Sequence, residues 1–131
     1  MENNRELSAE IFDTAMEYLP RLISGLEQAS GYLKKEEKAK GLQMLSEAGE
    51  GLMWFNQVVL GLPVILPQGE NTTDIRDNWQ PYSEALKNTV DHIENNNEAA
   101  IVKTLENEII PFIRMVYGKI GNLQTDNQYP Q

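Results

Sequence analysis

The sequence contains no cysteine and only one histidine, and these two shortages exclude most site chemistry. Without cysteine the chain forms no disulfide, holds no metal through thiolates and offers no cysteine nucleophile. His92 has a threonine three residues before it, so the Glu-x-x-His pattern of carboxylate-bridged metal pairs is missing. No glycine-rich phosphate loop follows a strand pattern. No serine or threonine has a plausible base to activate it, because the single histidine would have to serve. We therefore expect no catalytic residues, no metal and no cofactor.

Basic residues are also scarce. Eleven lysines and arginines stand against twenty acidic residues, which gives a formal net charge of −9. A charge of this sign repels nucleic acid and anionic lipid, so neither is an expected partner. The charged run at residues 34–40 mixes both signs, which is typical of a solvated turn rather than of an anion site.

Long hydrophobic runs are missing as well. The most apolar stretch is Leu52 to Leu66, where eleven of fifteen residues are apolar, but Asn56, Gln57 and Pro63 interrupt it. It is shorter than the roughly 20 residues that a membrane-spanning helix needs. The first ten residues are acidic and polar rather than a secretory signal, so we expect a cytoplasmic protein.

The apolar residues that are present recur at steps of three and four, which predicts helices. In the first third of the chain Phe12, Leu19, Leu26 and Leu33 follow at steps of seven, and similar stripes occur three more times. We predict one all-α domain, an antiparallel four-helix bundle of two helical hairpins, with helices at about residues 8–34, 36–61, 78–94 and 97–121. Residues 122–131 are expected to be disordered.

Prolines and glycines mark the expected bends and ends of these helices. Pro20 and Pro111 lie inside continuous stripes, so they should bend the first and last helices rather than end them. Gly61 and Pro63 should end the second helix, and Pro81 should fall in the first turn of the third. The two hairpins can also be aligned at an offset of sixty residues, either as a true internal duplication or because two amphipathic hairpins align by chance.

The second helix has two apolar stripes where the others have one. Leu45, Leu52, Phe55 and Val59 form the ordinary core stripe. A second stripe lies beside it, and its residues are the candidate partner-binding set: Met44, Gly51, Met53, Trp54, Val58 and Leu62. A helix that is apolar nearly all round is buried on most sides or binds a partner. Either the bundle and residues 63–67 cover this stripe, or a partner does.

Three glycines, Gly41, Gly49 and Gly51, lie within the same helix, and each costs about 0.5–1 kcal/mol relative to alanine. Close approach of a neighbouring helix or flexibility needed for binding would compensate. The expected function is a non-enzymatic module that binds a protein segment or a second copy of itself through the second helix. The alternative is a small-ligand binding protein with a cavity between the bent helices.

The hairpin FDTAMEYLPRLISGLEQASGYLKKEEKAKGLQMLSEAGEGLMWFNQVVL resembles the central hairpin of the FliS-type flagellar secretion chaperones in helix spacing and composition. The resemblance covers about half of the chain. It implies a small acidic helical bundle that presents an apolar groove to a disordered flagellin tail, and hence a chaperone-like or adaptor-like role. The N-terminal tyrosine and the Ser-Pro-Glu-Leu-type motif of that family are missing, so no site residue is carried over.

Overall fold

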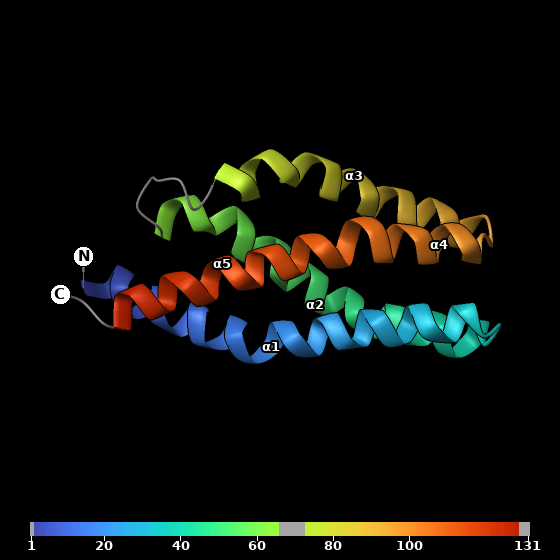
Figure 1. Ribbon diagram of the computed structural model, residues 1–131, viewed down its shortest axis with the longest axis horizontal. Helices are drawn as coiled ribbons and strands as arrows, with labels where there is room; N and C mark the ends of the chain where they lie inside the picture. Colours follow the sequence, from blue (N-terminus) through green and yellow to red (C-terminus); the bar gives the residue numbers. More distant parts are fainter. Residues whose placement is uncertain (1, 66–72, 129–131) are drawn as a thin grey trace.

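The computed structural model describes residues 2–65 and 73–128, and the side chains of residues 10–61 and 74–121 within them. The prediction of an all-α antiparallel four-helix bundle is confirmed, and no strand occurs in the described ranges (Figure 1). The elements are α1 (Glu2–Lys34), α2 (Lys38–Ile65), α3 (Thr73–Glu94), α4 (Glu98–Thr104), the π-helical turn η2 (Leu105–Ile109) and α5 (Ile110–Gln128). The last three run on without a break and form the fourth helix of the bundle.

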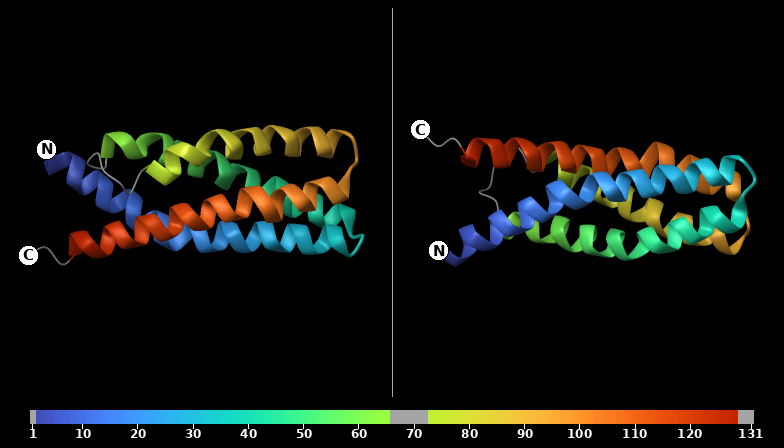
Figure 2. Two further views of the ribbon diagram at one scale, coloured as in Figure 1. Left: turned by 45° about the horizontal axis from the view of Figure 1, so that its top comes forward. Right: turned by 90° about the horizontal axis from the view of Figure 1, so that it is seen from below.

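The chain folds as two helical hairpins whose turns lie at the end opposite both termini (Figure 2). α1 lies along α2 and also along the fourth helix, and α3 lies along the fourth helix. Within the part of the chain that the structure describes, α2 and α3 do not come into extended close contact with each other. The fourth side of the bundle is therefore the widest. None of the described helices is long and apolar enough to cross a membrane.

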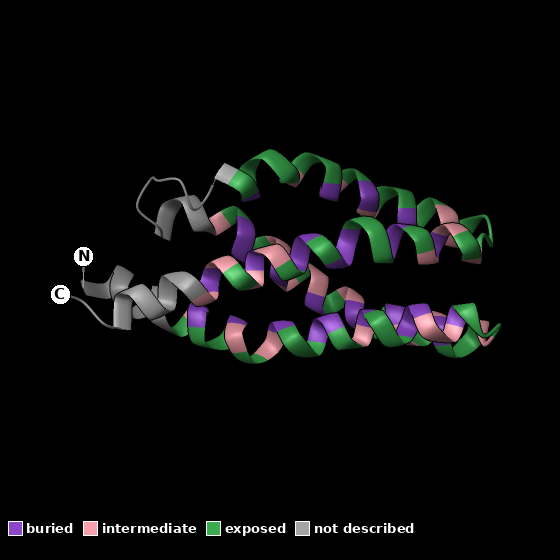
Figure 3. Cartoon of the chain, viewed as in Figure 1, coloured by how far each residue is buried: buried purple, intermediate pink, exposed green. Residues whose placement is uncertain are grey.

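Apolar side chains from all four helices form one core. Figure 3 marks the buried positions along the helices. Leu19 and Leu26 of α1, Phe55 of α2 and Leu105 of the π-turn are fully buried, as their spacing predicts. Near its middle the core is aromatic. Tyr82 stacks on Phe112 with ring centroids 4.3 Å apart, and Phe55 meets both rings edge-on. These large rings fill the space between α2 and the second hairpin.

Each of the two hairpin turns contains one residue with a positive φ angle. Glu36 and Asn96 adopt positive φ angles of 63° and 54°, a left-handed conformation that reverses the chain in few residues. After the second turn the side chain of Asn97 accepts a hydrogen bond from the Ala100 N–H and caps α4. Both turns thus lie where the polar runs of the sequence predict them, with the second helix beginning at Lys38, two residues later than expected.

Several predicted helix ends are wrong because the helix extends further than expected. α1 begins at Glu2, α3 begins at Thr73, and residues 122–128, which we expected to be disordered, continue α5. α2 runs past Gly61 to Ile65, because Gly61 does not take the positive φ of a C-cap. Extending an existing helix adds one hydrogen bond for each residue fixed, so packed amphipathic helices propagate beyond their last apolar contact.

The prolines are accommodated within helices. α1 continues through Pro20, as predicted. Pro81 lies well inside α3 rather than in its first turn, because α3 begins earlier than expected. The turn before Pro111 is π-helical, and the Ile110 N–H donates to the Leu105 carbonyl five residues back. A proline cannot donate to the carbonyl four residues before it, and the wider turn accommodates this loss.

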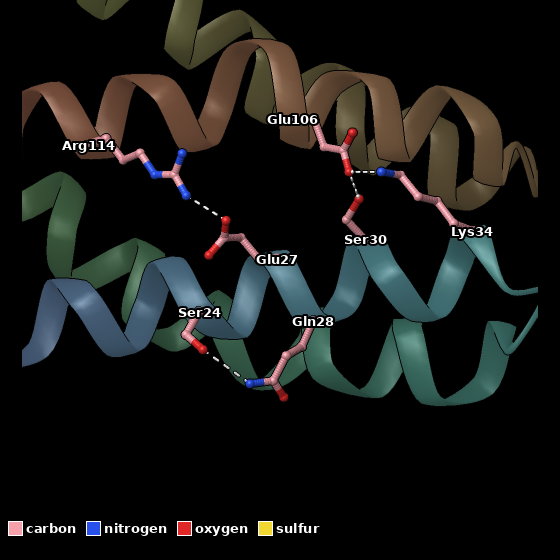
Figure 4. Close-up of polar contacts among 7 residues, drawn as sticks. All are labelled: Ser24, Glu27, Gln28, Ser30, Lys34, Glu106 and Arg114. Atoms are coloured by element: carbon pink, nitrogen blue, oxygen red, sulfur yellow. Dashed lines mark hydrogen bonds and ion pairs between the residues drawn. The ribbon is translucent and has the colours of Figure 1, made fainter.

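Polar contacts join the two hairpins across the side that α1 shares with the fourth helix (Figure 4). The buried Ser30 hydroxyl donates to Glu106 at 2.6 Å, and the Lys34 ammonium meets the same carboxylate oxygen at 2.5 Å. Further along the same side, Arg114 pairs with Glu27. The bonds from Lys34 and from Ser30 hold the pKa of Glu106 below its ordinary value of 4.5. Glu106 therefore couples the two hairpins while it is ionised.

We predict that this coupling makes stability depend on acid pH. Because the folded-state pKa of Glu106 is lowered, its contribution is present above pH 4.5 and is lost as the pH falls through the folded value. Glu106→Gln should lower stability by about 1 kcal/mol at pH 7 and should flatten the fall of the urea midpoint on acidification.

The matched control is Glu108→Gln, two residues along, which removes a carboxylate that makes no ion pair or hydrogen bond among the described residues. Urea titrations at several pH values compare the two variants with the parent chain. An unchanged pH dependence in Glu106→Gln would show that Glu106 does not couple the hairpins.

Candidate protein-binding face

The second apolar stripe of α2 is mostly covered, and α1 is what covers it. Gly51 is buried and Val58 is 7% exposed. Trp54 is half-buried and meets the Tyr18 ring of α1 edge-on, with ring centroids 5.4 Å apart. The expectation that Gly51 and Val58 form a free surface is therefore wrong, because spacing along one helix does not reveal which neighbour lies against it.

The other candidate residues are placed differently. Met44 is half-buried against the core, while Met53 is 66% exposed. The side chains of Leu62 and of residues 63–67, the segment that we considered as a cover, lie outside the described residues. Of the described candidates, only Met53 is left fully open to a partner.

Two of the four glycines in α2 permit the close approach of α1. A Cβ atom at Gly41 would lie 2.7 Å from Leu33 Cγ, and one at Gly51 would overlap the Tyr18 hydroxyl. No atom lies within 4 Å of the position that a Cβ would take at Gly49. Close helix packing thus accounts for two of the glycines, whereas Gly49 faces open space.

Three large apolar side chains remain exposed among the described residues: Met53 at 66%, Leu60 at 63% and Val90 at 54%. One hydrogen bond between α2 and α3 shows which side of each helix faces the other. The Tyr82 hydroxyl of α3 donates to Asn56 of α2 at 2.8 Å, so these two side chains point at each other across the wide side of the bundle.

Side chains three or four positions apart share a face of a helix. Gly49, Met53 and Leu60 therefore lie on the same side of α2 as Asn56. Leu86 and Val90 lie on the same side of α3 as Tyr82. We call these five residues, Gly49, Met53, Leu60, Leu86 and Val90, the α2–α3 face. It is the side where the two neighbouring helices do not come into extended close contact.

Charges of both signs border the α2–α3 face. Glu50 precedes Met53 by one turn, and Lys87 precedes Val90 by one turn; both are exposed. Neither residue forms an ion pair in the part of the chain that the structure describes. These charges at the border can therefore orient a charged partner. At long range, the net charge of −9 attracts a positively charged partner.

The hairpin end of the bundle carries a second polar region. A depression of about 570 Å³ lies there between the two turns, lined by Leu33, Lys34, Glu36, Lys38, Glu98, Ala99 and Val102. Its lysines are already engaged. Lys34 pairs with Glu106, and Lys38 bonds both Glu98 and Asn96. The region links the hairpins and does not present unpaired cations to an anion.

Among the described residues, no group of three or more histidine or acidic side chains is placed to hold a metal ion. His92 lies near the end of α3 and is half-buried. A smaller pocket of about 320 Å³ opens between α3 and the fourth helix, and Asn56 is not among its lining residues. Periodicity did not reveal this pocket, although Pro81 and Pro111, which both line it, were visible in the sequence.

Residues 10–117 match one protein-family model, which is described as a domain of unknown function, DUF8042. No curated protein and no solved structure matches the chain.

The two α2 glycines, Gly49 and Gly51, provide a matched test of the α1–α2 contact. Gly51→Ala should lower stability by about 1–2 kcal/mol, because the new methyl group displaces the Tyr18 ring from Trp54. Gly49→Ala should raise stability by about 0.5–1 kcal/mol, because it improves helix propensity in open space. Urea unfolding followed by tryptophan fluorescence measures both effects, and equal gains in the two variants would contradict the close approach.

Proposed function

The chain belongs to the DUF8042 family, and we propose that this member is a non-enzymatic module that binds an amphipathic helix of a basic partner protein along its α2–α3 face. One observation carries the proposal. The three large apolar side chains that are exposed in the described residues all border the one side of the bundle where neighbouring helices stay apart.

The spacing of these side chains suits a helical partner. Met53 and Leu60 are seven residues apart on α2, which corresponds to about 10.5 Å at 1.5 Å per residue. An amphipathic helix presents apolar anchors at i, i+3, i+4 and i+7, and therefore with the same repeat. Gly49, which has open space above it one turn before Met53, leaves room for an anchor from the partner.

The energy available from this surface is sufficient for a moderate affinity. Completely burying an exposed large apolar side chain contributes about 1.5–3 kcal/mol, and Met53, Leu60 and Val90 are each more than half exposed. Covering all three would contribute about 3–5 kcal/mol before the cost of association. Side chains that line the rest of the face, such as Leu86, add to this amount.

Charge decides between a foreign helix and a second copy. Two copies that each carry a net charge of −9 repel each other, whereas a helix with lysine and arginine on its polar side is attracted. We therefore favour the foreign helix. A chaperone-like or adaptor-like role would follow from such binding, in line with the resemblance to flagellar secretion chaperones, and the partner is defined here only by its chemistry.

We predict that a labelled 18-residue peptide with leucines at i, i+3, i+4 and i+7 and lysines elsewhere binds the protein with micromolar affinity. A peptide of the same composition in scrambled order, and one with glutamate in place of lysine, should bind at least tenfold more weakly. Met53→Glu and Val90→Glu should each weaken binding by about tenfold, which corresponds to about 1.4 kcal/mol. Fluorescence anisotropy at two salt concentrations measures these affinities.

The controls introduce the same charge away from the face. Gln43→Glu on α2 and Asn88→Glu on α3 are exposed positions on other sides of their helices and should leave peptide affinity within about twofold. Analytical ultracentrifugation of the free protein should show a monomer. A dimer that Met53→Glu and Val90→Glu dissociate would assign the face to a second copy instead, and equal binding of all three peptides would refute the proposal.

A further inference from the structure

A pocket between α3 and the fourth helix has features of a small-molecule site that the α2–α3 face lacks. It is a half-open depression of about 320 Å³, lined by Asn78, Pro81, Tyr82, Asn107, Glu108, Pro111, Phe112 and Met115. This volume lies at the lower end of the range for small-ligand pockets. The sequence alternative is a cavity between the bent first and last helices, whereas this pocket lies between α3 and the fourth helix.

The pocket lies where the fourth helix departs from α-helical geometry. Two of its lining residues, Asn107 and Glu108, belong to the π-helical turn, and Pro111 follows directly after that turn. Such single π-turns inside α-helices occur frequently at functional sites. Pro81 contributes from α3, so each helix that borders the pocket brings one residue that cannot donate a backbone hydrogen bond.

The lining has an apolar wall and an acceptor-rich rim. Phe112 and the stacked Tyr82 ring form the wall with Met115. The Tyr82 hydroxyl donates to Asn56 of α2, so its proton is already engaged within the protein. Burial raises the pKa of this hydroxyl, which therefore stays neutral.

The polar groups of the rim favour a cation. Glu108 brings a carboxylate that makes no ion pair among the described residues. Asn78 already donates its amide to the Asp74 carbonyl, which leaves its side-chain oxygen as an acceptor. No lysine, arginine or histidine occurs among the eight lining residues, and the net charge of −9 repels anions.

We propose that this pocket binds a small organic cation, an ammonium group on an aryl or alkyl body. The apolar body lies against Met115 and the small exposed parts of Phe112 and Tyr82. The ammonium group lies at the rim beside Glu108 and the Asn78 oxygen. The site is separate from the α2–α3 face and does not depend on the function proposed for it.

A charge series of similar shape tests the proposal. Phenethylammonium, 2-phenylethanol and phenylacetate are titrated separately into the isotopically labelled protein, and amide chemical shifts are followed by NMR. Phenethylammonium should shift the amides of residues 107–115 and 78–82 in a saturable manner, the alcohol should bind more weakly, and phenylacetate should not bind. Equal binding of the acid and the amine, no saturable binding of the amine, or shifts confined to other residues would overturn the proposal.

Two variants and one control distinguish the effect of the charge from the effect of the pocket. Glu108→Gln should weaken phenethylammonium binding by about two- to fivefold, as expected for one partly solvated ion pair, and should leave binding of the alcohol unchanged. Glu84→Gln removes an exposed carboxylate elsewhere on α3 and should change neither affinity. Asn107→Phe should fill the exposed rim and abolish binding of both ligands while the remaining amide spectrum stays folded. Full affinity in Asn107→Phe would show that the ligand binds elsewhere.

Discussion

The contact between α1 and α2 is the constraint on which the rest of the bundle depends. Gly41 and Gly51 remove the side chains that would hold the two helices apart, so Leu33 and Tyr18 of α1 lie directly over the α2 backbone. Trp54 then meets the Tyr18 ring edge-on. Gly51 and Trp54 of the second apolar stripe of α2 lie in this contact, whereas Met53 stays exposed.

One consequence concerns the opposite side of α2. Because α2 lies close to α1, the space toward α3 is bridged by side chains rather than by close helix approach. The Phe55 ring reaches Tyr82 and Phe112, and the Tyr82 hydroxyl reaches Asn56. Above this bridge Met53, Leu60 and Val90 stay exposed. The hairpins are held together mainly where α1 meets the fourth helix, through the core and through polar links such as that of Ser30 and Lys34 with Glu106.

Much of the fold could be predicted because a buried stripe has a fixed period. Phe12, Leu19, Leu26 and Leu33 repeat every seven residues, and all four are buried. Helix ends were harder to predict. Glycine is the residue type expected at a helix C-cap, but Gly61 does not have the positive φ angle of one. The π-turn before Pro111 could not be foreseen either. A proline in a helix requires some adjustment, but sequence does not specify whether the helix bends or widens.

The candidate site was predicted in part. The doubled apolar character of α2 correctly marks a helix that is buried from two directions. The sequence could not show that Tyr18, thirty-three residues before Gly51, covers the second stripe, because that contact depends on how two helices meet. Met53 is the one described member of the predicted set that is exposed. Its companions Leu60 and Val90 come from the edge of that stripe and from another helix, and only the fold brings the three to one side.

The most direct measurement is a methionine oxidation footprint read by mass spectrometry. Met53 is exposed, whereas Met16, Met44 and Met115 are half-buried, so dilute peroxide should oxidise Met53 before these three in the free protein. Saturation with the basic amphipathic peptide should then slow the oxidation of Met53 selectively and leave Met115 unchanged. If Met53 resists oxidation in the free, dilute protein, or if a bound peptide leaves its rate unchanged, the α2–α3 face is not the binding surface.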